Sequence, residues 1–528
     1  MEKIDLQDFL FNAEPTRRQL LKYHSDKHKK YKIQVFRNHS FELIEHLMAA
    51  YLDYADLGVD ICYSAYDDSF SFSDFEAEAH LYILWIDSER YKDKSISFLQ
   101  ESISRIRLLT DKNILLIPLG MHVDLKESGV AVWNIDEIAE EVGADYVEER
   151  YLEASGTRLS GRAQLVCARE LGLRYIPQLL LPPIKAIVVD LDNTLYEGVL
   201  GEDGINGITL TDSHKSLQER LKNYAQKGVF LAVISKNEEE DVTNLFAKRK
   251  DFPLEKSDFT CIFASWDRKS ENLRNLLGEL RISSESVLFI DDNVGEIKDV
   301  LDEYPRISVI QAKDDAKITQ TVLMNFPRLN MDLLSNDFVN RKDDLNANAT
   351  REEIKNTTQS FEDYVSSLKT KLSFSINDLE KVKRISELAN KTNQFIFSYK
   401  RYSENQIEKL MKNTDSCVVS VNLSDRLSDS GMIAVCVGKA DKNEIIIEEV
   451  FLSCRSLGRG LEEWIIKGAI QLICEFFMSQ NVQIMFVRGE RNAPAEKFVK
   501  EYLTDFVGCT RKFQYNMSEI SAETIINR

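Results

Sequence analysis

The sequence lacks any run of about 18 apolar residues, the length that a membrane-spanning helix requires. Its start, MEKIDLQDFLFN, lacks the basic segment and the following apolar segment of a secretory signal. The eight cysteines form no CxxC pair and have no histidine partners at zinc-ligand spacing. We therefore expect a cytoplasmic protein whose cysteines are reduced thiols, not disulfides or metal ligands.

Basic residues are also fewer than acidic ones. Lys and Arg total 67 against 86 Asp and Glu, which gives a formal net charge of -19. Such a balance repels the phosphates of nucleic acids and anionic lipids, and we find no basic patch interleaved with aromatic residues. We expect neither a nucleic-acid partner nor a membrane partner.

The chain has 528 residues, too many for one hydrophobic core, and we expect an α/β multidomain protein. Apolar strands alternate with amphipathic helices through residues 1–180, which predicts a parallel, flavodoxin-like α/β unit. The alternation returns in residues 181–326 and predicts a doubly wound, Rossmann-like domain. Its predicted strands are KAIVVD, VFLAVIS, CIFAS and SVLFIDD.

Residues 327–374 are polar and charged apart from one helical segment, so we expect a connector there. Residues 375–528 contain a helix, three consecutive strands, a long helix, a strand and another helix. This order predicts a mixed α+β domain.

The strand KAIVVD ends in the motif Asp190-x-Asp192-x-Thr194. Open α/β sheets bind ligands at the carboxyl ends of their strands. Two carboxylates at this spacing suit a nucleophile and a group that transfers a proton. A motif this short also occurs by chance, so a site is expected only if other strand ends of the same sheet carry suitable polar residues.

Three further polar positions lie at the ends of successive elements of the same sheet. Ser235 ends the second strand, Lys269 opens a helix after a polar turn, and Asp291-Asp292 ends the fourth strand. Alone, each has an ordinary explanation as a cap, a surface cation or a turn. Their common position at strand ends favours one shared site.

This order of motifs resembles that of the haloacid-dehalogenase superfamily. The resemblance implies that Asp190 is the nucleophile and that Asp192 is the general acid and base. It implies that Thr194, Ser235 and Lys269 orient and neutralise the phosphate of a small-molecule substrate. It also implies a magnesium site, with ligands from Asp190, the main-chain carbonyl of Asp192, Asp291 and, in support, Asp292.

The intervals between these motifs are too short to hold a cap domain, so we expect a capless phosphatase-like domain. The glycine-punctuated stretch 196–204 is expected to form a short flap. A lightly covered site can admit a phosphate that is carried on, or delivered to, a macromolecule.

A longer resemblance is to the FkbH-like branch of that superfamily. Its residues here are DLDNTLYEGVLGEDG, VISKNEEED, SWDRKSENL and LFIDDN, followed by ISELANKTNQF, VNLSDRLSDSGMIAV and FLSCRSLGRGLEEWII. The resemblance implies transfer of a glyceryl group from 1,3-bisphosphoglycerate, with loss of phosphate. The acceptor would be the phosphopantetheine thiol of an acyl carrier protein.

The C-terminal domain resembles the GNAT acyltransferase fold. Its segment Arg455-Ser456-Leu457-Gly458-Arg459-Gly460 is similar to the R-x-x-G-x-G/A loop of that fold. Backbone amides there would bind the pyrophosphate of CoA or the attachment of a phosphopantetheine arm. A simple glycine-containing turn is the alternative.

Cys454 precedes this loop and is a candidate carrier of an acyl group as a thioester. The alternative is a buried thiol at a strand end. No histidine follows His214, so the domain holds no Cys–His pair of its own. An activating base would have to be a carboxylate, a tyrosine or a group from another domain.

The N-terminal unit occupies the place of an SGNH-hydrolase-like domain in related proteins. It lacks a GDS motif and a late DxxH, although Asn38, His39 and Ser40 follow its first strand. We expect a degenerate domain that acts as a scaffold or docks a carrier protein.

The whole chain admits three hypotheses. The first is an enzyme that loads an acyl group onto an acyl carrier protein. The second is a capless phosphatase of a sugar phosphate or small metabolite, fused to an N- or O-acyltransferase. The third is a non-enzymatic scaffold that binds carrier proteins.

Overall fold

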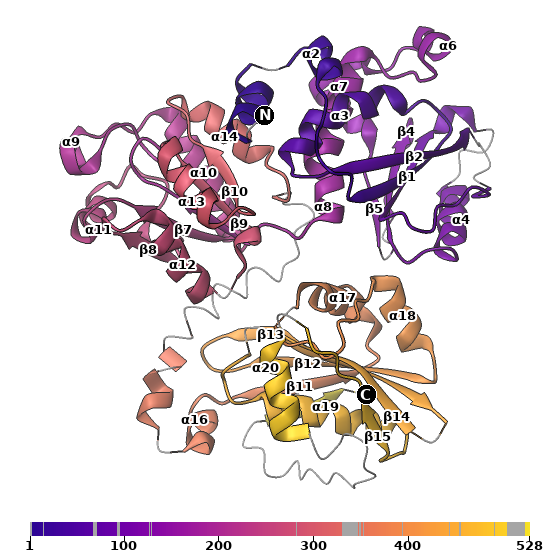
Figure 1. Ribbon diagram of the computed structural model, residues 1–528, viewed down its shortest axis with the longest axis vertical. Coiled ribbons are helices and arrows are strands. Elements are labelled where there is room, and N and C mark those ends of the chain that lie inside the picture. The colour runs from indigo at the N-terminus through magenta and orange to yellow at the C-terminus, as the bar shows by residue number, and fades with distance from the viewer. Residues whose placement is uncertain are drawn as a thin grey trace. The chain divides into compact units, whose positions relative to one another are not determined.

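The computed structural model describes residues 3–13, 15–66, 71–91, 96–125, 127, 129–280, 282–329, 347, 350–351, 353–358, 360–392, 394–442, 444–453, 456–489, 492–503 and 523–527. The chain separates into two compact units, residues 1–335 and residues 336–528 (Figure 1). They contain two parallel sheets and one mixed sheet, which confirms the predicted α/β multidomain class. Within the described residues, every helix falls short of the length and apolarity needed to cross a membrane.

The first sheet has the strand order β2-β1-β3-β4-β5, and all of its pairs are parallel. This is the flavodoxin-like order. The strands are β1 (Tyr31–Arg37), β2 (Val59–Tyr66), β3 (Leu81–Asp87), β4 (Asn113–Leu119) and β5 (Val130–Val132). The central strand β3 is buried along its whole length, as its continuous apolar sequence predicts. The edge strand β5 was not predicted.

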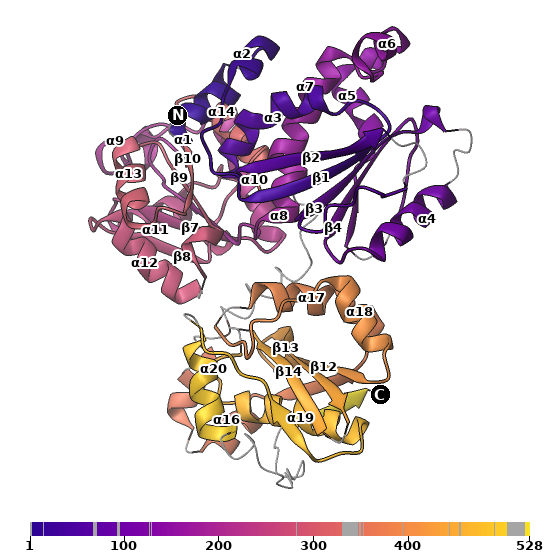
Figure 2. The same ribbon diagram turned by 45° about the vertical axis from the view of Figure 1, so that its right-hand side comes forward.

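Helices cover both faces of this sheet (Figure 2). On one face lie α3 (Glu42–Tyr54) and α7 (Gly161–Glu170), whose buried side chains share a core with Ile33 and Val35. On the other face α4 (Ile96–Arg107) packs against alternate residues of the same strands. A strand buried on both faces needs no polar alternation, which explains its uniformly apolar sequence.

The second sheet has the order β10-β9-β6-β7-β8 and is also parallel throughout. Chain order reverses at β6, so that this sheet has the Rossmann arrangement with its crevice beside the first strand. The strands are β6 (Ala186–Val189), β7 (Phe230–Ser235), β8 (Cys261–Ala264), β9 (Val287–Asp291) and β10 (Ser308–Gln311). The helices are α9 (Leu200–Gly207), α10 (Asp212–Gln226), α11 (Glu239–Lys248), α12 (Lys269–Leu280), α13 (Val294–Glu303) and α14 (Ala316–Met324).

The two parallel sheets belong to one compact unit, so the boundary expected near Leu181 separates two sheets but not two independent units. One continuous cluster of buried side chains extends through both parts. For example, the rings of Tyr54 and Phe326 pack edge to face with centroids 5.9 Å apart. Arg328 donates to the carbonyl of Pro182 at 3.2 Å, which fixes the segment between the sheets.

The second unit has one sheet in the order β15-β14-β13-β12-β11-β16. Its central pairs are antiparallel, and the outer pairs β14–β15 and β11–β16 are parallel. The strands are β11 (Lys371–Ile376), β12 (Ser416–Ser424), β13 (Asp429–Asp441), β14 (Glu444–Leu452), β15 (Val482–Ile484) and β16 (Glu523–Asn527). This mixed sheet agrees with the predicted α+β fold.

The helices α17 (Val382–Lys391), α18 (Glu404–Lys412) and α19 (Glu462–Phe476) belong to this second unit. Strand β11 begins at Lys371, inside the range 327–374 that was expected to be a connector. The C-terminal boundary of the expected connector was therefore wrong. Polar residues in this strand alternate with Leu372 and Phe374, which are buried. A half-buried strand has this alternation, and a short one resembles a polar linker in sequence.

Candidate active site

The predicted catalytic residues lie at the carboxyl ends of neighbouring strands in the second sheet. Asp190 directly follows β6, Ser235 ends β7, and Asp291 ends β9. Residues Val189 and Ile290 are partners across β6 and β9, and the amide of Asp190 donates to the carbonyl of Ile290 at 2.9 Å. This register brings together Asp190 and Asp291, the acidic residues at the ends of these two strands.

The ammonium group of Lys269 lies between two buried carboxylates. Its Nζ is 2.6 Å from Asp291 Oδ2 and 3.1 Å from Asp190 Oδ1. Burial raises the pKa of Asp190 and of Asp291, while the charge of Lys269 opposes the increase. Burial lowers the pKa of Lys269, but the two carboxylates outweigh this effect and the net shift is upward. The cluster thus contains two carboxyl groups and one amino group.

Asp292 brings a third carboxylate to this cluster. One side-chain oxygen from each of Asp190, Asp291 and Asp292 lies within 4.8 Å of the others. Burial, followed by the nearby charge of Asp190, raises the pKa of half-buried Asp292. Hard oxygen ligands and excess negative charge are what Mg²⁺ requires, so this group fits the ion. The main-chain carbonyl of Asp192 stays a predicted ligand.

Asp192 is held by three donors. Its Oδ1 accepts hydrogen bonds from Tyr196 Oη at 2.7 Å and from the amide of Leu200 at 2.9 Å. Its Oδ2 accepts one from Asn237 Nδ2 at 2.8 Å. These contacts fix the direction of the Asp192 carboxylate, for which proton transfer stays a predicted role.

Asn237 was not among the predicted site residues. Its Nδ2 also lies 3.0 Å from Ser235 Oγ, so one side chain connects the end of β7 with Asp192. Asn237 is buried, with an exposed fraction of 3%. The only sign of this role in the sequence was a polar residue two positions beyond a strand end. The turn after β7 brings the Asn237 side chain to Asp192.

Thr194, in the turn after β6, and Ser235, at the end of β7, are the two hydroxyl-bearing residues among the predicted site residues. Both side chains are buried, and Thr194 Oγ1 has no hydrogen-bond partner among the described residues. A buried hydroxyl without a partner carries a desolvation cost, which a bound ligand can remove. A phosphate oxygen is a suitable acceptor for it.

The stretch expected to form a flap contains a turn followed by helix α9. Gly198 has a φ of 105°, and an added Cβ would lie 2.8 Å from Asp203 Oδ2, so the turn requires glycine. Two backbone hydrogen bonds between Glu197 and Thr209 hold the two ends of this segment together. The interval between β6 and β7 holds α9 and α10, and that between β7 and β8 holds α11 and one short helical turn.

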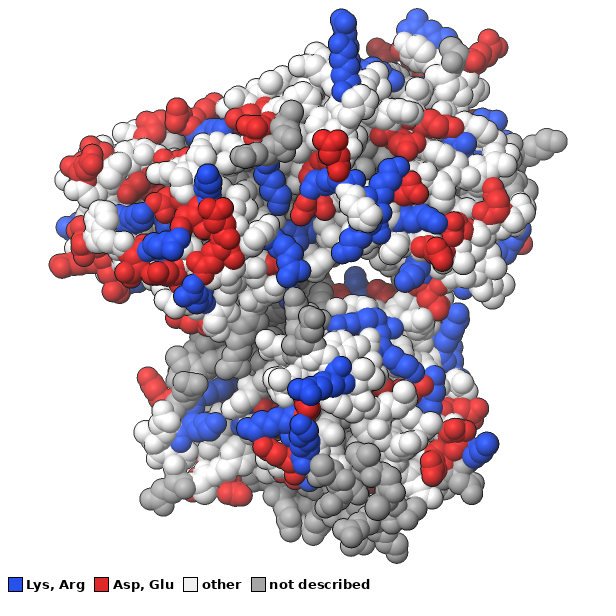
Figure 3. Space-filling model, in the orientation of Figure 1, with Lys and Arg blue, Asp and Glu red and all other residues white. Residues whose placement is uncertain are grey.

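Acidic side chains gather on the face shown in Figure 3 where α11 and α13 lie. The first turn of α11 contributes Glu239, Glu240 and Asp241. Carboxylates at a helix N-terminus stabilise the helix through its dipole. A surface of this sign repels a polyanion, in agreement with the net charge of the chain.

The predicted acyltransferase loop lies between β14 and α19. Cys454 and Arg455 are outside the described residues. Gly458 and Gly460 have φ values of 81° and 77°, and an added Cβ at Gly460 would lie 2.7 Å from the ring of Phe361. The close packing of the loop against Phe361 therefore requires glycine at position 460.

Other contacts in this loop are made within the second unit. The amide of Gly458 donates to Glu462 Oε1 at 2.6 Å. Arg459 is buried and donates to Ser430 Oγ at 3.2 Å, while Leu457 is partly buried. The amide expected to bind a pyrophosphate thus already has an acidic partner. The roles of Leu457, Gly458, Arg459 and Gly460 in cofactor binding remain predictions.

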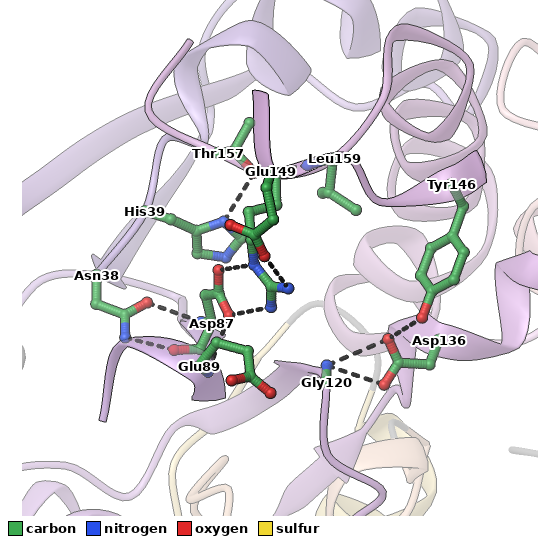
Figure 4. Close-up of polar contacts among 11 residues, drawn as sticks. Asn38, His39, Asp87, Glu89, Gly120, Asp136, Tyr146, Glu149, Thr157 and Leu159 are labelled. Atoms are coloured by element: carbon green, nitrogen blue, oxygen red, sulfur yellow. Dashed lines mark hydrogen bonds and ion pairs between the residues drawn. The ribbon is translucent and has the colours of Figure 1, made fainter. Parts of the chain in front are cut away.

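A second polar cluster lies at the carboxyl ends of β1 and β3 in the first sheet (Figure 4). Asn38 Oδ1 accepts from the amide of Asp87 at 2.7 Å, and its Nδ2 donates to the carbonyl of Asp87 at 3.0 Å. The Asp87 carboxylate accepts two hydrogen bonds from Arg158, at 2.6 Å and 2.8 Å. These contacts hold together loops that are far apart in the sequence.

His39 belongs to the same cluster, while Ser40 points elsewhere. The Nδ1 atom of His39 lies 2.9 Å from Thr157 Oγ1 (Figure 4). The His39 ring stacks on Trp85, with ring centroids 4.8 Å apart. Burial lowers the pKa of His39 to about 3. Ser40 Oγ donates to Glu42 Oε2 at 2.9 Å and not to His39. The described contacts therefore form a structural link and not a Ser–His–Asp relay.

No protein-family model and no curated protein matches this chain. Among solved structures, one match is the N-terminal part of the protein BF1531 from Bacteroides fragilis, containing a phosphatase domain and complexed with Mg. It is 17% identical, with 60% of this chain and 99% of that chain covered and a TM-score of 0.46.

Another match is a ribosomal-protein-alanine N-acetyltransferase from Brucella melitensis biovar Abortus 2308. It is 8% identical, with 28% of this chain and 98% of that chain covered and a TM-score of 0.20. At these identities and TM-scores, neither likeness assigns an activity to this chain.

Proposed function

We propose that the first unit is a magnesium-dependent phosphoryl-transfer enzyme of the capless haloacid-dehalogenase type. The observation that carries this proposal is the convergence of Asp190, Lys269, Asp291 and Asp292 at one edge of a parallel sheet. The buried, unpartnered hydroxyl of Thr194 adds a place for a phosphate oxygen. A surface cluster of acids would not need a buried ammonium group at its centre.

In the proposed reaction, a carboxylate oxygen of Asp190 attacks the phosphorus atom and the bond to the leaving oxygen breaks. Asp192 gives a proton to that leaving oxygen. Water then attacks the aspartyl-phosphate, Asp192 takes a proton from it, and inorganic phosphate leaves with Asp190 regenerated. Magnesium, when bound, offsets the repulsion between Asp190 and the incoming phosphate.

Lys269 and the hydroxyl groups have positioning and electrostatic roles in this scheme. Lys269 holds Asp190 and Asp291 in place and adds positive charge close to the transferred group. Ser235 and Thr194 orient the phosphate oxygens. Asn237 holds Asp192 beside Ser235, so that the acid and the phosphate site keep a fixed relation.

The test is magnesium-dependent release of phosphate from acyl phosphates and sugar phosphates by the full chain. The variant D190N should lower turnover by roughly a thousandfold or more, because it removes the nucleophile. D212N is the matched control, since Asp212 has a fully exposed side chain at the start of α10. Equal activity of D190N and D212N, or no turnover by the unaltered protein, would favour the scaffold hypothesis.

For the complete chain we propose transfer of a glyceryl or similar acyl group to the thiol of an acyl carrier protein. Support comes from the resemblance to the FkbH-like branch, the absence of a cap between the described motifs, and the α+β fold of the second unit. Intact mass spectrometry of a holo carrier protein, incubated with the enzyme and 1,3-bisphosphoglycerate, tests it. A glyceryl mass gain supports loading.

Release of phosphate without that mass gain would favour the second candidate, a phosphatase of a small metabolite fused to an N- or O-acyltransferase. In the same assay C454A tests covalent transfer through Cys454. Unimpaired loading by C454A would remove that residue from the mechanism.

A further inference from the structure

The N-terminal helix α1 (Lys3–Gln7) lies against the end of the edge strand β10 (Figure 2). Gln7 is buried, with an exposed fraction of 2%. Its Nε2 donates to the carbonyl of Gln311 at 2.8 Å, and its Oε1 accepts from the amide of Gln311 at 3.0 Å. The side chain of Gln7 thus pairs with the edge strand as another strand would.

The side chain of Gln311 continues this connection to the metal loop. Its Nε2 donates to the main-chain carbonyl of Asp292 at 3.2 Å. Its Oε1 accepts from Lys313 Nζ at 2.7 Å, and Lys313 forms an ion pair with Asp8 at 2.7 Å. An ammonium group can only donate, so this partner fixes which end of the Gln311 amide faces Asp292.

The main chain of β10 is also joined to the metal-binding strand. Gln311 is the partner of Asp291 in the β10–β9 register, and the amide of Ala312 donates to the carbonyl of Asp291 at 2.8 Å. Both predicted acidic ligands at the end of β9 are therefore held at their backbone from the β10 side. The residues predicted to orient the phosphate lie elsewhere: Ser235 ends β7, and Thr194 is in the turn after β6.

We propose that Gln7 and Gln311 are positioning residues for the magnesium site, and that the N-terminal helix thereby sets the affinity of the metal loop. This inference rests on the proposed function, because it concerns the same site. Neither glutamine belongs to the ligand set or to the phosphate-facing residues. Gln7 holds the edge strand, and Gln311 holds the carbonyl beside the Asp292 side chain, which limits the rotation of that ligand.

The test is the magnesium dissociation constant of the full chain, measured by isothermal titration calorimetry for the unaltered protein and for Q7A and Q311A. Q311A should weaken binding on the order of tenfold, as loss of an outer partner of a metal ligand does. Q7A acts one step further away and should weaken it about threefold, the effect of part of one hydrogen bond. Melting temperatures of the same samples report general destabilisation.

The matched control is Q320A. Gln320 Nε2 donates to the carbonyl of Ser216 at 3.2 Å and joins α14 to α10, in the same sheet domain but away from the metal loop. It should lower the melting temperature without changing the dissociation constant. If Q7A and Q311A match Q320A in magnesium affinity, the inference is wrong while the proposed function stands. If the unaltered protein binds no magnesium, both are wrong.

Discussion

At the scale of single residues, the acidic motifs could be predicted because strand ends converge. Asp190 and Asp291 follow continuous apolar strands, and parallel strands bring such ends to one edge. Asn237 could not be predicted in the same way. Its contacts with Asp192 and Ser235 depend on the path of the turn after β7, which has no signature in the local sequence.

Replacing Asn237 tests the role that the structure gives it. N237A removes a hydrogen bond to the Asp192 carboxylate, worth about 2 kcal/mol for a charged acceptor. We expect kcat to fall on the order of 30-fold, with a smaller change in KM. N325A is the matched control, because Asn325 bonds the carbonyl of Thr321 at the end of α14, within its own helix. Equal kcat values for the two variants would contradict the positioning role.

His39 should make the protein acid-labile. Its pKa is 6.5 in the unfolded chain and about 3 in the folded chain, so between these values only the unfolded chain takes up the proton. The contribution of neutral His39 to the free energy of unfolding is therefore fully present above pH 6.5. It is lost as the pH falls from 6.5 towards 3, by up to about 1.4 kcal/mol per pH unit. Chemical denaturation at several pH values should show this slope.

The variant H39Q should flatten that slope, whatever its effect on total stability. H46Q, at an exposed position of α3, is the control and should keep the slope of the unaltered protein. An unchanged slope in H39Q would mean that other groups cause the acid sensitivity.

At the scale of elements, the buried apolar strands were predictable, whereas the edge strands β5 and β10 were not. β3, β6, β7 and β9 are buried along their lengths, and such strands read as continuous apolar runs. The edge strands β5 and β10 have three and four residues. They depend on pairing with a neighbouring strand, which a short segment does not reveal by its own sequence.

Helix α19 lies close against the third sheet at Gly438. A Cβ added there would lie 2.6 Å from Ile473 Cγ2, so G438A should force the helix away and destabilise the second unit by about 1–3 kcal/mol. G278A is the control: Gly278 is an exposed residue of α12 with open space around its Cα. There alanine should stabilise by about 0.5–1 kcal/mol. Thermal melts should shift in opposite directions.

At the scale of the whole molecule, the order of the domains followed from alternating patterns, but their grouping did not. The two parallel sheets share one core and the N-terminal helix bonds the last strand of the second sheet. Contacts across about 300 residues of sequence leave no local signal, so the core that the two sheets share could not be predicted.

In the proposed reaction, Asp190 carries the phosphoryl group as an aspartyl-phosphate. The most direct measurement uses D192N with magnesium and an aryl phosphate, whose leaving group needs no acid. D192N should release one equivalent of the phenol rapidly and then slow down, since breakdown of the intermediate needs Asp192 as base. Acid-quenched peptide mapping should then find a phosphoryl group on Asp190. Release of the phenol with the phosphoryl group on another residue, or an undiminished burst in D190N, would contradict the account.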